Sequence, residues 1–130
     1  MVTSARLGFF VDGYNVYCNS ERREPMEIEI KEITRDNFQT EVIEAGGPVL
    51  LDFYADWCGP CKRQLPVLLE AAKEACDVKF CKVNIDHNQE LCEKLDVEQV
   101  PTMLVMNGER VYRRIVGSRS LEELLECLEM

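Results

Sequence analysis

The stretch that decides the fold covers residues 49–62 and reads Val49-Leu50-Leu51-Asp52-Phe53-Tyr54-Ala55-Asp56-Trp57-Cys58-Gly59-Pro60-Cys61-Lys62. Its apolar first half, broken by a single aspartate, predicts a strand that is buried on both faces. Gly59 and Pro60 then turn the chain, and apolar residues recur at helical spacing, at Leu65, Leu68, Leu69 and Ala72. A Cys-x-x-Cys pair therefore lies where a central strand ends and a helix begins.

This position favours reactive sulfur chemistry at Cys58 and Cys61. The first turn of a helix offers unpaired N–H groups and the positive end of the helix dipole, which favour a thiolate over a thiol. Two intervening residues keep the sulfurs close enough to bond. Cys58, at the exposed helix end, is expected to be the nucleophile, and Cys61, one turn further in, the resolving thiol.

Two other interpretations of the pair are half of a zinc site and two inert thiols. A structural zinc site needs a second pair of ligands, and the candidates for it are Cys76 and Cys81. These two straddle a predicted helix end and the next strand, so the redox interpretation is favoured and no metal site is expected.

Composition narrows the class of protein further. The chain has 130 residues, 46% of them apolar, which suits one domain with a full core. A net charge of −9 argues against nucleic-acid binding, and no apolar segment approaches the ~20 residues of a membrane span. An odd count of seven cysteines without a signal peptide indicates a cytoplasmic protein in a reducing environment. The protein is also expected to be a monomer. The further cysteines, expected to stay reduced, are Cys18, Cys76, Cys81, Cys92 and Cys127.

The remaining chain predicts an α/β fold. The expected strands cover residues 26–33, 49–54, 78–85, 103–106 and 109–116, the last two joined by a hairpin at Asn107-Gly108. Four helices are expected. The first begins after Thr34 or Asp36 as its cap, the second covers 62–75 with a kink at Pro66, and the third covers 88–95. The fourth begins at a capping box of Ser120 and Glu123. This order predicts a mixed central sheet, with a parallel part, an antiparallel C-terminal hairpin, and helices on both faces.

Residues 1–25 are expected to form an N-terminal extension that packs loosely or stays mobile. Within it, residues 10–16 are similar to the opening strand of PIN-like nucleases, in which the residue matching Asp12 binds metal. Such a site needs several more carboxylates on a complete α/β domain, so the extension is favoured.

The hexapeptide from Trp57 to Lys62 resembles the active-site signature of the thioredoxin family, and the element order matches that fold over residues 26–130. The resemblance implies that Asp52 is a buried proton acceptor for Cys61 and that Lys82 neighbours and modulates it. It also implies a cis-proline at Pro101, facing the dithiol. The expected substrate surface comprises Trp57, Gly59, Pro60, Val100, Pro101, Thr102 and Gly117, with the backbone before Pro101 pairing with the substrate as an added strand.

The residues alone leave alternatives open at these positions. A lone carboxylate in an apolar strand should have a raised pKa, but Asp52 also fits a solvated strand bulge. Lys82 alone would be an ordinary surface lysine, and Pro101 a trans proline at a strand start. The chain departs from the family at Tyr54, where many members have tryptophan, and at Glu98-Gln99, where a small residue is usual.

The resemblance implies a protein-disulfide reductase that cycles through a Cys58–Cys61 disulfide, binds no cofactor and is re-reduced by a thioredoxin reductase using NADPH. The chain has no dinucleotide fingerprint, so reducing equivalents must come from outside. One alternative is a disulfide isomerase or oxidase, against which the resemblance argues, because it associates Gly-Pro between the cysteines with reductases. The other is a binding or chaperone module, which has no need of the dithiol.

Overall fold

A computed structural model describes residues 29–129, and these form an open sheet of five strands in the order β1-β3-β2-β4-β5. The strands are β1 (Lys31–Glu32), β2 (Pro48–Tyr54), β3 (Lys79–Asn84), β4 (Thr102–Asn107) and β5 (Arg110–Val116). β1, β3 and β2 pair in parallel, while β4 and β5 add antiparallel. The predicted mixed sheet with a C-terminal hairpin is confirmed. Gly108 takes a positive φ of 64° in the turn of that hairpin.

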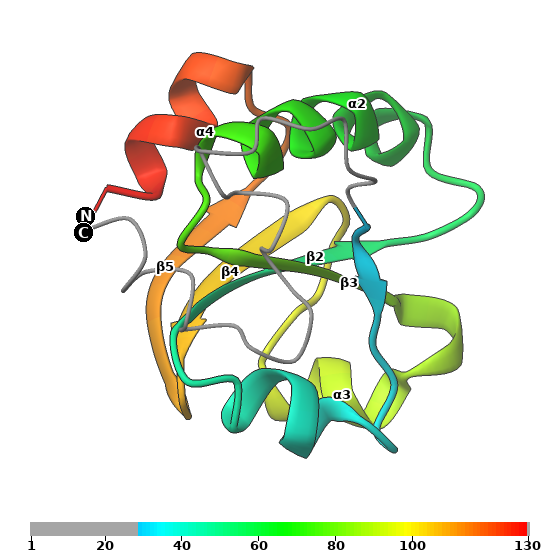
Figure 1. Cartoon of the computed structure of the whole chain (residues 1–130). Coiled ribbons are helices and arrows are strands. Elements are labelled where there is room, and N and C mark those ends of the chain that lie inside the picture. The colour runs from blue at the N-terminus through cyan, green and yellow to red at the C-terminus, as the bar shows by residue number, and fades with distance from the viewer. Residues whose placement is uncertain (1–28, 130) are drawn as a thin grey trace.

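Helices cover both faces of the sheet (Figure 1). α2 (Gly59–Glu74) and α4 (Leu121–Cys127) lie on one face, and η3 (Gln39–Ile43) and α3 (Gln89–Lys94) on the other. Each face has its own core, because strand side chains alternate: Leu50 and Phe80 join the α2 side, whereas Leu51 and Cys81 join the α3 side. β2 has a buried residue at every interior position, as its apolar sequence predicts.

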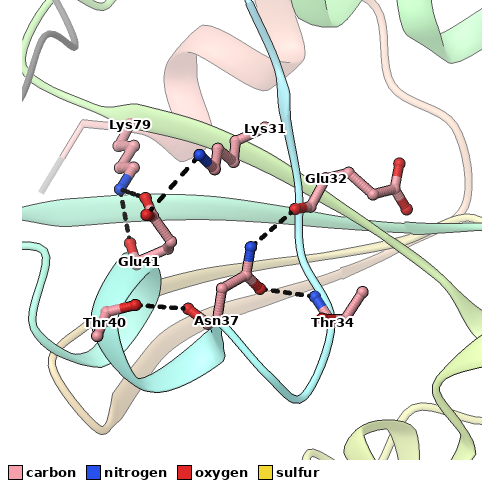
Figure 2. Close-up of polar contacts among 7 residues, drawn as sticks. All are labelled: Lys31, Glu32, Thr34, Asn37, Thr40, Glu41 and Lys79. Carbon is pink, nitrogen blue, oxygen red and sulfur yellow. Dashed lines mark hydrogen bonds and ion pairs between the residues drawn. The ribbon is translucent and has the colours of Figure 1, made fainter.

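The first strand and helix are shorter than predicted. Of the part of 26–33 that the structure describes, only Lys31–Glu32 forms ladder pairs. Asn37 explains the delayed helix, because its side chain accepts from the Thr34 N–H (2.8 Å) and donates to the Glu32 carbonyl (3.2 Å), as Figure 2 shows. Residues 34–37 are therefore held as a turn, and a single π-helical turn follows at Gln39. Phe38 and Val42 are buried on its inner side, as predicted.

η3 is tied to the sheet by charge. The Glu41 carboxylate forms ion pairs with the buried Lys79 ammonium at 2.7 Å and with the Lys31 ammonium at 3.8 Å (Figure 2). Lys79 also donates a hydrogen bond to the Glu41 carbonyl at 2.8 Å. These contacts join β3 and β1 to the helical turn between β1 and β2. A buried lysine is tolerated only with such partners.

α2 differs from the prediction at one position of its inner face. Leu65 is 37% exposed, and the buried residues are Cys61, Gln64, Leu68, Ala71 and Ala72. The helix begins at Gly59, ahead of the predicted Lys62, and this earlier start includes Cys61 in the buried stripe. Pro66 lies inside the helix, as expected.

The predicted capping box of α4 is confirmed. Ser120 Oγ accepts from the Glu123 N–H at 3.2 Å, and Glu123 Oε1 accepts from the Ser120 N–H at 3.0 Å. The predictions for residues 1–25, Asp12 and Cys18 lie outside the described residues. Within residues 29–129, no helix combines the length and the apolar character that crossing a bilayer would take.

Two leucines on α2 test this packing directly. Leu68 is fully buried, so Leu68→Ala should lower the free energy of unfolding by about 2–5 kcal/mol in urea titrations. The matched control, Leu65→Ala, should change it by less than about 1 kcal/mol, because Leu65 is partly solvated. Equal losses for the two variants would contradict the observed inner face of the helix.

Candidate active site

Cys58 and Cys61 form a disulfide at the junction of β2 and α2. Their Cα atoms are 5.3 Å apart, within the usual range for a disulfide. Cys58 is the N-cap of α2, and its Sγ accepts a hydrogen bond from the Cys61 N–H at 3.2 Å. In the reduced protein, this N–H and the helix dipole would both stabilise a thiolate on Cys58.

The helix end at which Cys58 was expected is exposed at Gly59 and Pro60, but the Cys58 side chain itself is buried in this oxidised state. Both cysteines are 4% exposed, because Ala55, Ile85 and Val100 pack around them in one small cluster. What distinguishes the two is their surroundings. Cys58 Sγ accepts a hydrogen bond from the Cys61 N–H, whereas the Cys61 side chain lines a cavity that it shares with Asp52.

Asp52 is buried in the middle of β2. The residue is 3% exposed, and its Oδ1 has no hydrogen-bond partner among the described residues. Burial raises the pKa of Asp52 from its ordinary value of 3.8 to about 7, against a smaller lowering effect of the Lys82 ammonium. A cavity of about 190 Å³ joins this carboxyl to Cys61 and is also lined by Leu65 and Lys82. Asp52 is thus no solvated bulge residue: it is paired in register within the sheet.

Lys82 lies beside Asp52, since the two residues are register partners on β3 and β2. Its ammonium, however, is 3.9 Å from Glu32 Oε1 and 5.6 Å from the centre of the Tyr54 ring. The sequence-based analysis did not single out Glu32 as a site residue. A signal existed: Glu32 has the same strand phase as Ile30, so it projects from the same face of the sheet as Ile30, the face that α2 covers.

The segment Val100-Pro101-Thr102 lies against the disulfide. The Val100–Pro101 bond is cis, as the resemblance implies, and Val100 packs on the cluster that holds the two cysteines. The Gly117 N–H donates to the Pro101 carbonyl at 2.9 Å, which brings Gly117 beside this segment. Thr102 Oγ1 donates to the Gln99 carbonyl at 2.6 Å and fixes the approach to β4. Glu98 and Gln99, the departures from the family pattern, are both exposed.

Trp57 is the large apolar side chain exposed beside the disulfide. It is 68% exposed, and its indole Nε1–H donates to Asp86 Oδ2 at 3.0 Å. Gly59 and Pro60, at the start of α2, are exposed next to it. The sequence-based analysis placed Asp86 only at a strand end, and the pairing of Asp86 with Trp57 depends on a contact 29 residues away in the chain.

A second residue that the sequence-based analysis missed is Gln64. It is 2% exposed, and its side-chain amide makes two hydrogen bonds to the backbone of Arg119, at 2.8 and 3.1 Å. These bonds tie α2 to the loop after β5, which carries Gly117. A polar residue on the buried stripe of a helix was the available signal, because such a group needs a partner.

The other described cysteines are separate from this site. Cys81 and Cys92 are buried in the core on the α3 side, as predicted for small core residues. Burial raises the pKa of the Cys81 thiol to about 12 and also raises that of Cys92. Cys76 and Cys127 are free and partly exposed. Among residues 29–129, no cluster of three or more His, Cys, Asp or Glu residues is placed to hold a metal ion.

Comparisons with known proteins agree with the site. The family model described as Thioredoxin matches residues 29–130. A thioredoxin from Pseudomonas aeruginosa is 39% identical over 105 residues, which are 80% of this chain and 97% of that protein. A thioredoxin from Streptomyces clavuligerus is 36% identical over 96 residues, 74% of this chain and 90% of that protein. A bifunctional thioredoxin reductase/thioredoxin from Mycobacterium leprae is 39% identical over 98 residues, 75% of this chain and 21% of that protein.

A redox-capable disulfide at a helix start, packed against a cis-proline segment in an open mixed sheet, defines a thiol–disulfide oxidoreductase. The chain belongs to the thioredoxin family, and its activity is that of a protein-disulfide reductase.

The buried Asp52 carboxyl predicts a specific pH dependence of stability. The folded protein keeps a proton on Asp52 that the unfolded chain releases, so stability falls as pH rises from about 4 to about 7. Asp52→Asn removes this titration. Its stability gain should therefore grow across that window and reach on the order of 4 kcal/mol above pH 7.

Urea unfolding of the oxidised protein at about pH 4 and about pH 8 measures this difference. The control is Asp77→Asn, the same substitution at an exposed turn residue outside the Asp52 cavity. A gain for Asp52→Asn that is constant with pH would refute the assignment of a raised pKa to Asp52.

Proposed function

We propose that Cys58 is the nucleophile of this reductase and Cys61 the resolving thiol. The Cys58 thiolate attacks one sulfur of a substrate disulfide, the substrate S–S bond breaks, and the other substrate sulfur leaves as a thiolate. Cys61 then attacks Cys58 Sγ, the mixed disulfide breaks, and the second substrate thiolate is released. Two electrons pass to the substrate, and the Cys58–Cys61 disulfide remains.

The cavity between Asp52 and Cys61 is the observation that carries the proton step of this proposal. A carboxyl with a pKa of about 7 is poised to accept a proton near neutral pH. Asp52 takes the proton of the Cys61 thiol as that sulfur attacks, and Lys82 modulates how readily Asp52 carries a negative charge. Cys61 lines this cavity and Cys58 does not, which supports the assignment of roles.

Substrate docking is assigned to the surface around the disulfide. The backbone of Val100, directly before Pro101, offers a short edge on which a substrate segment adds as a strand, and Thr102 follows at the start of β4. Trp57, Gly59, Pro60 and Gly117 form the remainder of this surface. The exposed Glu98 and Gln99 border it, so they are placed to influence the choice of partner.

The electron donor is proposed to be a thioredoxin reductase that uses NADPH. The name of the Mycobacterium leprae relative, a bifunctional thioredoxin reductase/thioredoxin, supports this partner. We further propose a cytoplasmic, monomeric protein whose catalytic domain spans residues 26–130, with residues 1–25 as an extension. The family model supports these bounds, since its match begins at residue 29.

The assignment of Cys58 and Cys61 predicts opposite behaviour of two variants. Cys61→Ser should trap a stable mixed disulfide with oxidised insulin, detectable by mass spectrometry, whereas Cys58→Ser should form none. Both should lower insulin reduction driven by dithiothreitol at least ~100-fold. Cys76→Ser, at a partly exposed free thiol, is the control and should keep full turnover. A trapped adduct on Cys61 in Cys58→Ser would reverse the roles.

The direction of electron flow separates a reductase from the alternative of an oxidase or isomerase. The reduction potential of the Cys58–Cys61 pair, measured in glutathione or dithiothreitol buffers, should be about −270 mV. A value of about −180 to −120 mV would instead indicate a protein that oxidises or reshuffles its substrates. A binding or chaperone module would show a normal disulfide but only background insulin reduction.

A further inference from the structure

Three charged side chains lie in one row across the parallel part of the sheet. Glu32 on β1 pairs in register with Lys82 on β3, and Lys82 pairs in register with Asp52 on β2. Register partners in a sheet project from the same face, so the Lys82 ammonium has a carboxylate on either side. This row leads from the solvent edge of the sheet to the buried Asp52.

The contacts in the row are unequal. Glu32 Oε1 lies 3.9 Å from Lys82 Nζ, whereas no ion pair within 4.0 Å joins Lys82 to Asp52. The Tyr54 hydroxyl donates to both Glu32 oxygens, at 2.9 and 3.0 Å, which holds that carboxylate in place. The Asp52 Oδ1 atom, by contrast, has no partner among the described residues. The ammonium is therefore drawn toward the outer carboxylate.

The exposure of the three side chains shows why the attraction of the Lys82 ammonium to Glu32 affects Asp52. The Glu32 and Lys82 side chains are 43% and 30% exposed, while Asp52 is 3% exposed. An ammonium acts more strongly on a buried carboxylate than on a solvated one at the same distance, because solvent screens the latter. A small displacement of Lys82 along the row therefore changes the electrostatic environment of Asp52.

We propose that Glu32 is a positioning residue, which together with Tyr54 holds the Lys82 ammonium away from Asp52 and so keeps the Asp52 carboxyl proton-accepting near neutral pH. The consequence for catalysis rests on the proposed role of Asp52. In that step a proton moves from the Cys61 thiol to the Asp52 carboxylate while Cys61 attacks Cys58. Lys82 placed fully on Asp52 would stabilise the carboxylate and make it a weaker base.

The titratable and charged groups that face Asp52 come from several elements. Those that line its cavity are Lys82 on β3, Tyr54 on β2, Asp56 after β2, and Cys61 and Lys62 on α2, and Glu32 on β1 lies behind Lys82 and Tyr54. Of these, Glu32 contacts both Lys82 and Tyr54, so a change at Glu32 is relayed to two residues that line the Asp52 cavity.

The test is Glu32→Gln, which removes the charge but keeps an oxygen that can accept from Tyr54. Lys82 is then free to approach Asp52, so the Asp52 titration midpoint should fall by about half a pH unit or more. The carboxyl carbon chemical shift of Asp52, followed by NMR titration of the oxidised protein, gives this midpoint directly. The control is Glu90→Gln, which breaks the exposed ion pair with Arg35 on the far face and should leave the midpoint unchanged.

Two results would overturn the proposal. One is an unchanged Asp52 midpoint in Glu32→Gln. The other would come from a double-mutant cycle. If Glu32 acts through Lys82, the shift of the Asp52 midpoint caused by Glu32→Gln should shrink to less than half in the Lys82→Gln background. An effect of equal size in both backgrounds would mean a direct field of Glu32, with no positioning of Lys82.

The same variants separate this inference from the proposed function. The NMR midpoint does not depend on Asp52 being a proton acceptor, whereas the pH profile of the Cys61 step under single-turnover conditions does. A midpoint that falls, with a pH profile that follows it, supports both. A midpoint that falls with an unmoved profile supports the positioning by Glu32 and refutes the role of Asp52 in catalysis.

Discussion

The active site depends on one constraint: a strand that is buried on both faces is followed directly by a helix, and the two cysteines lie at the start of that helix. β2 lies in the centre of the sheet, so its end is fixed by neighbours on both sides. β3 supplies Lys82 beside Asp52, and β4 begins directly after the cis Pro101, beside the disulfide. Cys58 ends the connection as the N-cap of α2. The position of the sulfur atoms is thus a property of the sheet and the helix together.

The same constraint explains an otherwise unfavourable residue. A carboxyl group with an unpaired oxygen in the middle of β2 destabilises the fold, since burying a charge without a partner is costly. The cost is reduced because the group keeps its proton up to about pH 7, and because the cavity beside it also borders Lys82. Under the mechanism proposed above, stability is therefore given up at the position where the Cys61 step needs a base, and carboxyl groups with raised pKa values are common in enzyme sites.

The sequence predicted those features that depend on local chemistry. The apolar run of β2, the Cys-x-x-Cys turn, the Asn107-Gly108 hairpin and the Ser120 capping box are all signalled by residues close in the chain. Features that depend on distant contacts escaped prediction. Gln64 took the buried helix position expected for Leu65 because its amide finds the Arg119 backbone, 55 residues away. The contact of Asp86 with Trp57 and that of Glu32 with Lys82 likewise join separate elements.

Trp57 gives the protein a built-in optical reporter. It is the single tryptophan of the chain, it directly precedes Cys58, and most of its side chain faces solvent while its indole N–H is held by Asp86. Tryptophan emission from this protein therefore comes from one ring of known position at the rim of the disulfide. A change in that emission on reduction, or when another protein covers the ring, reads out events at this surface without any added label.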